Sequence, residues 1–305
     1  MQRILLSALV LTALRAGALD GADAALDQAQ ARAALERLGA KVTVDANAAG
    51  APVAKVDLSA GAVTDADLAC LAGLDQLRAL KLNGTAVTDA GIARLARLTG
   101  LVSLDLANTR VTDAAFVHLR GMAQLERLNL EGAPVADARL KDLQALPSLR
   151  TLILDHTRIS DAGMADLGAS TGITWLDLGG TVVTAAGLAR LERMTGLRWL
   201  SLAQNGLGPE HVALGDEALA TVRTHTQLTY LDLRLTRITD AGLASLAVLP
   251  RLENLGLWQT QVTGAGLAHL TGLAQLTRID ARETGVTEVD VAEFTKAVPK
   301  CRVRR

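Results

Sequence analysis

The sequence predicts an α/β solenoid, and two observations predict it. An aliphatic residue opens a similar unit every 24 residues from Val53 onward; eight of the nine intervals have this length, and the interval from Leu197 to Leu228 is 31. Each unit also divides into a strand-like half and a helix-like half. Units this short cannot bury an apolar face alone, so successive copies must stack on one shared core. The ten units begin at Val53, Leu77, Leu101, Leu125, Leu149, Ile173, Leu197, Leu228, Leu252 and Leu276.

The composition restricts both the core and the partners. Hydrophobic residues make up 50% of the 305 residues but aromatic residues only 2%, so the core must be aliphatic. Lys and Arg number 31 against 32 Asp and Glu, which gives a formal net charge of −1. This balance favours neither nucleic acid nor an anionic membrane as the partner.

Residues 1–24 resemble an export signal. Arg3 provides a basic start, residues 4–14 form an uncharged apolar run, and small residues follow at 16–18 and 22–24. The run is too short to span a bilayer permanently, and no Cys follows it to carry a lipid. We therefore expect export to the periplasm, the cell surface or the medium, with no membrane span in the mature chain. The alternative is a cytoplasmic protein that begins with an amphipathic helix.

Residues 25–52 lack the repeat and are expected to cap its first unit. Apolar residues at Leu26, Ala29, Ala33 or Ala34, and Leu38 follow helical spacing, which predicts a helix over residues 23–39. Gly39 suits the end of that helix, and residues 41–45 alternate like a strand. Such a cap shields the open end of a stacked core.

The third unit shows how each repeat is built. Residues 101–106 alternate as a short strand with Leu104 and Leu106 inward, and a turn leads to a short helix that opens at Thr112. Ser or Thr at that place can cap the helix, and the Asp that follows favours its positive end. The equivalent hydroxyl residues are Thr64, Thr88, Ser160, Thr184, Thr239, Thr263 and Thr287.

At this point the units resemble a known family. Residues 77–92, Leu-Arg-Ala-Leu-Lys-Leu-Asn-Gly-Thr-Ala-Val-Thr-Asp-Ala-Gly-Ile, resemble the leucine-rich repeat. The Thr-Asp-Ala-Gly-Leu continuation is similar to repeats of planctomycete and related bacterial proteins and, in style, to F-box-type leucine-rich repeats. Residues 34–42 and 298–303 look like the ends of the bacterial family. The resemblance implies a right-handed horseshoe over residues 53–305, with a parallel sheet on its concave face, short helices on its convex face and a recognition role.

The ninth position of the repeat departs from the usual Asn. It is Thr in seven of the ten units, and we expect its hydroxyl to bond the backbone of the neighbouring coil. These residues are Thr85, Thr109, Thr157, Thr181, Thr236, Thr260 and Thr284, whereas Asn205 keeps the usual residue.

All Trp and Tyr residues fall at concave positions of four consecutive units. Trp175, Trp199 and Tyr230 share the third position, which predicts a ladder about 10 Å long across strands ~4.8 Å apart. Asp177 and Asp232 would flank it, with Arg234 and Arg282 on the other side. Exposed aromatics anchor recognition surfaces, although aromatic pairs also stiffen sheets. The predicted ligand-binding residues are Trp175, Trp199, Tyr230, Trp258, Asp177, Asp232 and Arg234.

The long seventh unit carries an insertion at residues 206–212, Gly-Leu-Gly-Pro-Glu-His-Val. It leaves the chain between the Trp199 and Tyr230 strands, beside the predicted ladder. Loops on a rigid scaffold often carry function, but solenoids also tolerate inert insertions.

Motifs of catalysis are missing from the sequence. It has no phosphate-binding Gly-rich loop, no zinc-ligand spacing and no Gly-x-Ser-x-Gly. Of the five His, only His156, beside Asp155, is placed near the concave rim, where a polar contact is its expected role. Cys70 and Cys301 lie about nine units apart, too far for a disulfide. We expect no enzyme activity, cofactor or metal.

The sequence thus predicts a monomer that recognises a protein or peptide on its concave face. Two alternatives remain open. One is an envelope carbohydrate-binding protein that stacks sugars on the aromatic residues. The other is an F-box-like adaptor or injected effector, suggested by the repeat style.

Overall fold

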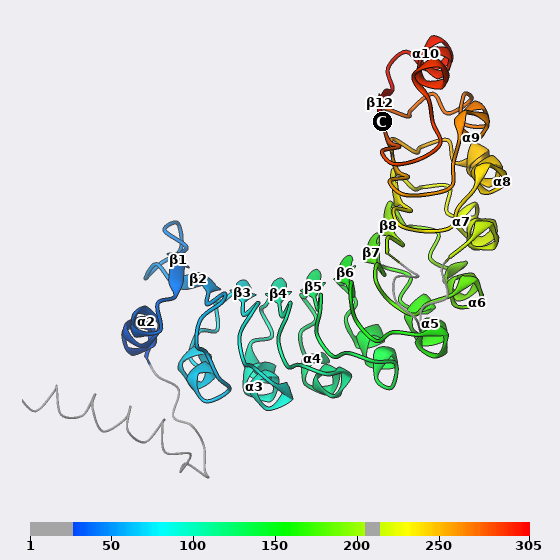
Figure 1. Ribbon diagram of the computed structural model, residues 1–305. Helices are drawn as coiled ribbons and strands as arrows, with labels where there is room; N and C mark the ends of the chain where they lie inside the picture. The colour runs from blue at the N-terminus through cyan, green and yellow to red at the C-terminus, as the bar shows by residue number, and fades with distance from the viewer. Residues whose placement is uncertain (1–26, 205–213) are drawn as a thin grey trace, which may run out of the picture.

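The computed structural model describes residues 27–204 and 214–305, which form one stacked solenoid (Figure 1). A sheet of twelve strands, in the order β1 to β12, runs along one side of it, and the helices line the other side. The predicted export signal, Leu26, Asn205 and the insertion at residues 206–212 lie outside the described residues. None of the described helices has both the length and the apolar character that crossing a bilayer requires.

The strands are short and parallel from β2 onward, each pairing with the same repeat position of the next unit. Only β1 pairs antiparallel, with β2. The strands are β1 (Lys41–Val44), β2 (Val53–Asp57), β3 (Ala79–Lys81), β4 (Ser103–Asp105), β5 (Arg127–Asn129), β6 (Thr151–Ile153), β7 (Trp175–Asp177), β8 (Trp199–Ser201), β9 (Tyr230–Asp232), β10 (Asn254–Gly256), β11 (Arg278–Asp280) and β12 (Arg302–Arg304).

The convex side mixes short α-helices with 3₁₀ turns, as units too short for long helices require. The α-helices are α2 (Gln28–Arg37), α3 (Asp89–Arg94), α4 (Phe116–Leu119), α5 (Asp161–Gly168), α6 (Ala185–Leu188), α7 (Leu219–Val222), α8 (Asp240–Ala244), α9 (Gly264–Ala268) and α10 (Glu288–Ala297). The 3₁₀ helices are η1 (Asp67–Leu71), η2 (Leu95–Arg97), η3 (Asp113–Ala115), η4 (Leu140–Ala145), η5 (Ala189–Leu191), η6 (Asp216–Ala218) and η7 (Ser245–Val248).

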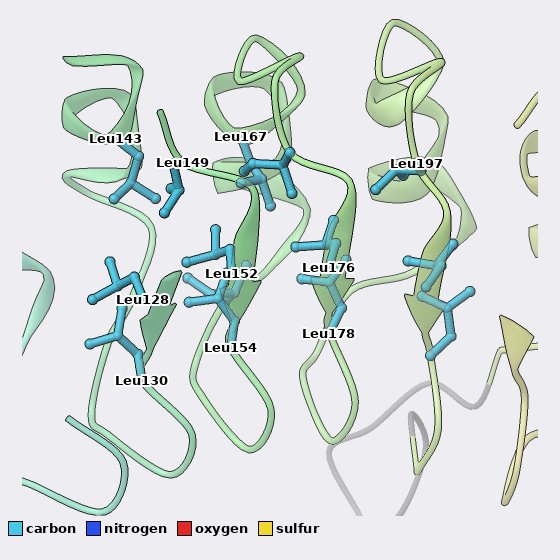
Figure 2. Packing of buried hydrophobic residues seen from close by; sticks show 14 of the residues in the cluster. Leu128, Leu130, Leu143, Leu149, Leu152, Leu154, Leu167, Leu176, Leu178 and Leu197 are labelled. Atoms are coloured by element: carbon cyan, nitrogen blue, oxygen red, sulfur yellow. The ribbon is translucent and has the colours of Figure 1, made fainter. Parts of the chain in front are cut away.

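The core is aliphatic, as the composition predicts. Rows of leucine from equivalent positions fill the space between sheet and helices, and Figure 2 shows Leu128, Leu152 and Leu176 in one such row. Phe116 and Phe294 are the buried aromatic residues among those described. Cys70 and Cys301 are both free and buried, and burial raises the pKa of their thiols to about 12 and about 11.

The N-terminal cap contains the predicted helix and strand, α2 and β1, and Gly39 adopts a positive φ of 75° after the helix. The predicted apolar stripe was wrong. Ala31 and Leu35 are the buried residues of α2, with Ala34 and Leu38 partly buried, while Ala29 is exposed. The helix is rotated relative to the expected stripe because it packs on the sheet end through this other face.

Hydroxyl residues cap the convex helices as predicted. The Oγ1 of Thr88, for example, accepts a hydrogen bond from the N–H of Ala90 at the start of α3. The Asp after each hydroxyl residue does more than was expected, because it joins neighbouring units. Asp161 accepts hydrogen bonds from both the N–H and the hydroxyl of Thr184 in the next unit, at 2.7 and 2.6 Å. The same paired bonds link Asp65–Thr88, Asp89–Thr112, Asp137–Ser160, Asp216–Thr239 and Asp240–Thr263.

This Asp ladder explains the glycine of the Thr-Asp-Ala-Gly sequence. A Cβ at Gly187 would overlap the Asp161 carboxylate of the preceding unit. Glycine is therefore required because the carboxylate and the helix backbone approach closely, not because the helix needs a positive φ.

The ninth-position threonines are buried, but their predicted bonding was wrong. Thr85 donates its hydroxyl to the carbonyl of Leu82, three residues back in its own unit, at 2.6 Å. The other six threonines do the same within their own units. Thr is shorter than Asn, and its hydroxyl reaches the local turn rather than the next coil.

Candidate functional site

The predicted ladder exists and lies along three consecutive strands. Trp175, Trp199 and Tyr230 are cross-strand neighbours at the first residues of β7, β8 and β9. The ring centroids of Trp175 and Trp199 are 4.2 Å apart, and those of Trp199 and Tyr230 are 4.9 Å apart. Both separations are close to the ~4.8 Å spacing of strands. The sequence register alone therefore located this stack, across the 31-residue interval.

The orientation of the rings decides which parts of them a ligand can touch. Each neighbouring pair is stacked with an interplanar angle of 9°. Because the planes face one another along the ladder, both faces of Trp199 are covered and the ring edges point away from the sheet. Trp175 is the most exposed ring, at 36% of its surface, and its outer face has no aromatic neighbour among the described residues. The ladder thus offers edges along its length and a face only at its ends.

Trp258 is separate from the ladder. It lies two residues beyond Gly256 at the end of β10 and stacks on no other aromatic ring in the described part of the chain. The guanidinium of Arg282 lies over its ring, 5.7 Å from the centroid. This distance is within the range of a cation–π contact. The four predicted aromatic anchors therefore form one group of three and one Trp–Arg pair.

Asp232 and Arg234 bind each other rather than lying on opposite sides of the ladder, as was expected. The Nε–H of Arg234 donates to both carboxylate oxygens at 2.8 Å, and its second guanidinium nitrogen lies 2.6 Å from Oδ2. The Asp232 side chain is only 2% exposed, whereas that of Arg234 is 39% exposed. The hydrogen bonds from Asp232 raise the pKa of Arg234. Arg282 binds Asp280 in the same way on β11.

Asp177 has different surroundings although it occupies the same repeat position. Its carboxylate accepts a hydrogen bond from the N–H of Gly179 at 3.0 Å. Burial raises the pKa of Asp177 to about 6, and the negative charges of Asp155 and Asp232 add to the rise, while hydrogen bonds from Gly179 and Ser201 oppose it. A part-buried carboxylate beside other carboxylates is held at a cost in stability.

Asp155 belongs to this group, and sequence reasoning placed it only beside His156. Burial raises its pKa and so does the charge of Glu131, while His156, 3.8 Å from its carboxylate, lowers it. The available signal was its seventh-position register in the unit before Gly179, which places it next to that glycine. His156 itself is half exposed and adopts a positive φ of 53° in the turn.

No metal site accompanies these carboxylates. Over residues 27–204 and 214–305, no three His, Cys, Asp or Glu side chains are arranged to hold a metal ion. A cavity of about 320 Å³ lies where the chain passes from η4 and α5 into the next strands, and it contains none of the predicted site residues. Its lining includes Leu143, Gln144, Leu146, Pro147, Arg150, Ser170 and Ile173.

Comparison with known proteins supports the repeat architecture. A family model described as "Leucine Rich repeat" matches residues 145–168 and 224–247. A search of curated proteins gave no match. Among solved structures, the ectodomain of the Arabidopsis receptor kinase HAESA, in complex with an N-terminally extended IDA peptide hormone, aligns over 94% of this chain and 46% of its own with 19% identity and a TM-score of 0.58.

Two further structures show similar repeats. HAESA in complex with IDA and the co-receptor SERK1 aligns over 80% of this chain and 40% of its own, with 19% identity and a TM-score of 0.55. An internalin from Listeria monocytogenes aligns over 98% of this chain and 94% of its own, with 18% identity and a TM-score of 0.46. The chain thus spans less than half of the HAESA chains. At these identities the HAESA likeness concerns the fold alone.

Proposed function

Because the chain is a leucine-rich repeat protein, with an open parallel sheet as one whole face, we propose that it binds a protein or peptide on that concave face. The single observation that carries the proposal is the aromatic ladder with its part-buried carboxylates. The aliphatic core has no need of these rings, and they are partly exposed on the strand face. Exposed Trp and Tyr beside polar groups are typical anchors of recognition surfaces.

The scaffold suits a binding role. Each strand is fixed by its neighbours and by the Asp ladder on the convex side, so the side chains on the sheet keep their spacing before a ligand arrives. Preorganisation of this kind reduces the entropic cost of binding. HAESA was crystallised with a peptide hormone, and this observation on a protein of similar fold is the reason to test peptides first. We propose no catalytic role, cofactor or metal.

The stacked geometry disfavours the carbohydrate alternative. A sugar ring stacks on the face of an aromatic ring, and both faces of Trp199 are covered by Trp175 and Tyr230. Only the outer faces of the two end rings could take a sugar. Peptide side chains and backbone, by contrast, can contact ring edges, indole N–H groups and neighbouring carboxylates along the whole ladder.

The test is selection of peptides from a random twelve-residue phage-displayed library on the full chain. Trp175→Ala and Trp258→Ala should each lower the affinity of the selected peptides at least tenfold. Trp199→Ala is less suitable than it first appeared, because loss of two stacking contacts worth about 0.5–1.5 kcal/mol each would also destabilise the fold. Val248→Ala, a change at a 55% exposed residue of η7, is the matched control.

Two results would contradict the proposal. The first is selected peptides that bind all these variants equally well. The second is a fall in melting temperature in the Trp175 and Trp258 variants with binding retained, which would assign the rings a purely structural role. A glycan panel followed by tryptophan fluorescence would test the carbohydrate alternative.

A further inference from the structure

Three carboxylates occupy the fifth repeat position on the C-terminal half of the sheet, and two of them are neutralised within their own strands. Asp232 is held by Arg234 and Asp280 by Arg282, in each case a guanidinium two residues further along. At the equivalent place after Asp177 the chain has Gly179, which has no side chain. In the described residues Asp177 has no ion-pair partner.

Gly179 marks a point at which oxygen atoms converge. A Cβ built on it would lie 2.8 Å from Oδ1 of Asp155, 3.2 Å from Oδ1 of Asp177 and 3.1 Å from the carbonyl oxygen of Ala203. The two carboxylate oxygens are consequently no more than about 6 Å apart, on neighbouring strands β6 and β7 or the turns that follow. The absence of a side chain at Gly179 leaves this surface open between them.

The cations nearby do not satisfy the pair. Arg234 acts on the Asp155 carboxylate from a distance, but its own donors are directed at Asp232. His156 is 3.8 Å from Asp155 and carries charge only when protonated. Glu131 and Asp232 add further negative charge around the two carboxylates. A positive group from outside would therefore find complementary charge here that the chain itself does not neutralise.

We propose that the bound peptide places a basic side chain, preferably arginine, between Asp155 and Asp177, with its methylene groups against the exposed ring of Trp175. This inference rests on the proposed concave-face function and names the chemistry of its ligand. Arginine fits best because its planar guanidinium presents five donors and can serve two carboxylates at once. The stem of the side chain would pack along the end of the ladder, since Trp175 begins the same strand that ends at Asp177.

The experiment uses the peptides selected on the full chain and replaces each basic residue in turn by citrulline, a neutral analogue of arginine. On the unaltered protein, one such replacement should lower affinity at least tenfold. On the Asp155→Asn and Asp177→Asn variants the same replacement should lower affinity by less than threefold, because the partner charge is already gone. Asn keeps the size and one acceptor oxygen of the carboxylate, which favours folding, and circular dichroism verifies it.

Asp105→Asn is the matched control. Asp105 has the same repeat position and accepts the same hydrogen bond, from the N–H of Ala107 at 3.1 Å, but its cross-strand neighbour is Lys81. This variant should bind every peptide as the unaltered protein does.

The outcomes separate the two proposals. Peptides that depend on Trp175 and Trp258 but tolerate citrulline and both Asn variants would overturn the basic-residue inference and leave concave-face recognition intact. Selection that yields no peptide dependent on these rings would overturn both. Citrulline sensitivity that persists unchanged in both Asn variants would place the basic group elsewhere and also reject the inference.

Discussion

Replacement of Asp177 by Asn should stabilise the protein at neutral pH and leave its stability unchanged in acid. The carboxylate is part-buried next to Asp155, and its pKa rises from an ordinary 3.8 to about 6. Because one pKa unit corresponds to about 1.4 kcal/mol, holding the charged form in the folded state costs up to about 3 kcal/mol. The expected gain in the free energy of unfolding is about 1–3 kcal/mol at pH 7.

The direction of the pH dependence follows from the raised pKa. Between pH 3.8 and about 6 the folded state keeps a proton on Asp177 that the unfolded state has lost. Stability contributed by this group is therefore greatest below the unfolded value and falls as pH rises through the folded value. Asn has no proton to lose, so the Asp177→Asn variant should lack this fall.

Urea unfolding at pH 4, 5, 6 and 7, followed by circular dichroism, measures the difference between the variant and the unaltered protein. Using the difference cancels the opposite contributions of Asp57, Asp280 and Asp290, whose pKa values are lowered by hydrogen bonds. A gain that is equal at pH 4 and pH 7 would refute the reasoning. An equal, pH-dependent gain in Asp105→Asn, whose cross-strand neighbour is Lys81, would refute it as well.

Two further predictions concern the scaffold. Arg234→Ala should lower the free energy of unfolding by about 3–5 kcal/mol, because it leaves the 2% exposed Asp232 carboxylate without a partner, whereas Arg282→Ala should cost less because its partner is 15% exposed; equal losses in urea unfolding would contradict this. Gly187→Ala should cost about 1–3 kcal/mol through overlap with the Asp161 carboxylate. Gly272→Ala, where a Cβ meets nothing within 4 Å, is its control and should leave the melting temperature unchanged.

The period of the sequence was sufficient to place the strands and the aromatic residues, because stacking fixes which positions become neighbours. Trp199 and Tyr230 are neighbours even though 31 residues separate them, since the strand register is unaffected by an insertion in the turn. Features that depend on side-chain conformation were not predictable. Asp232 binding Arg234, Asp161 binding Thr184 and Thr85 bonding its own turn each depend on which of several reachable groups a side chain meets.

The N-terminal helix failed for a related reason. Several residues of α2 are alanine, so more than one face is apolar enough to pack, and the contact with the end of the sheet decides which face is buried. The sequence alone does not distinguish Ala29 from Ala31.

The Asp ladder on the convex side has two missing rungs, and each lies opposite an aromatic contact. Ala185 stands where Asp would reach the seventh unit, and Gly264 where it would reach the tenth. On the opposite face, Trp175 stacks on Trp199 across the first of these junctions, and Arg282 lies over Trp258 across the second. In a molecule whose stability is a sum over neighbouring interfaces, the aromatic residues act as clasps at the two joints that the outer side leaves unfastened. A ligand that grips those rings would therefore also set the bend of the solenoid.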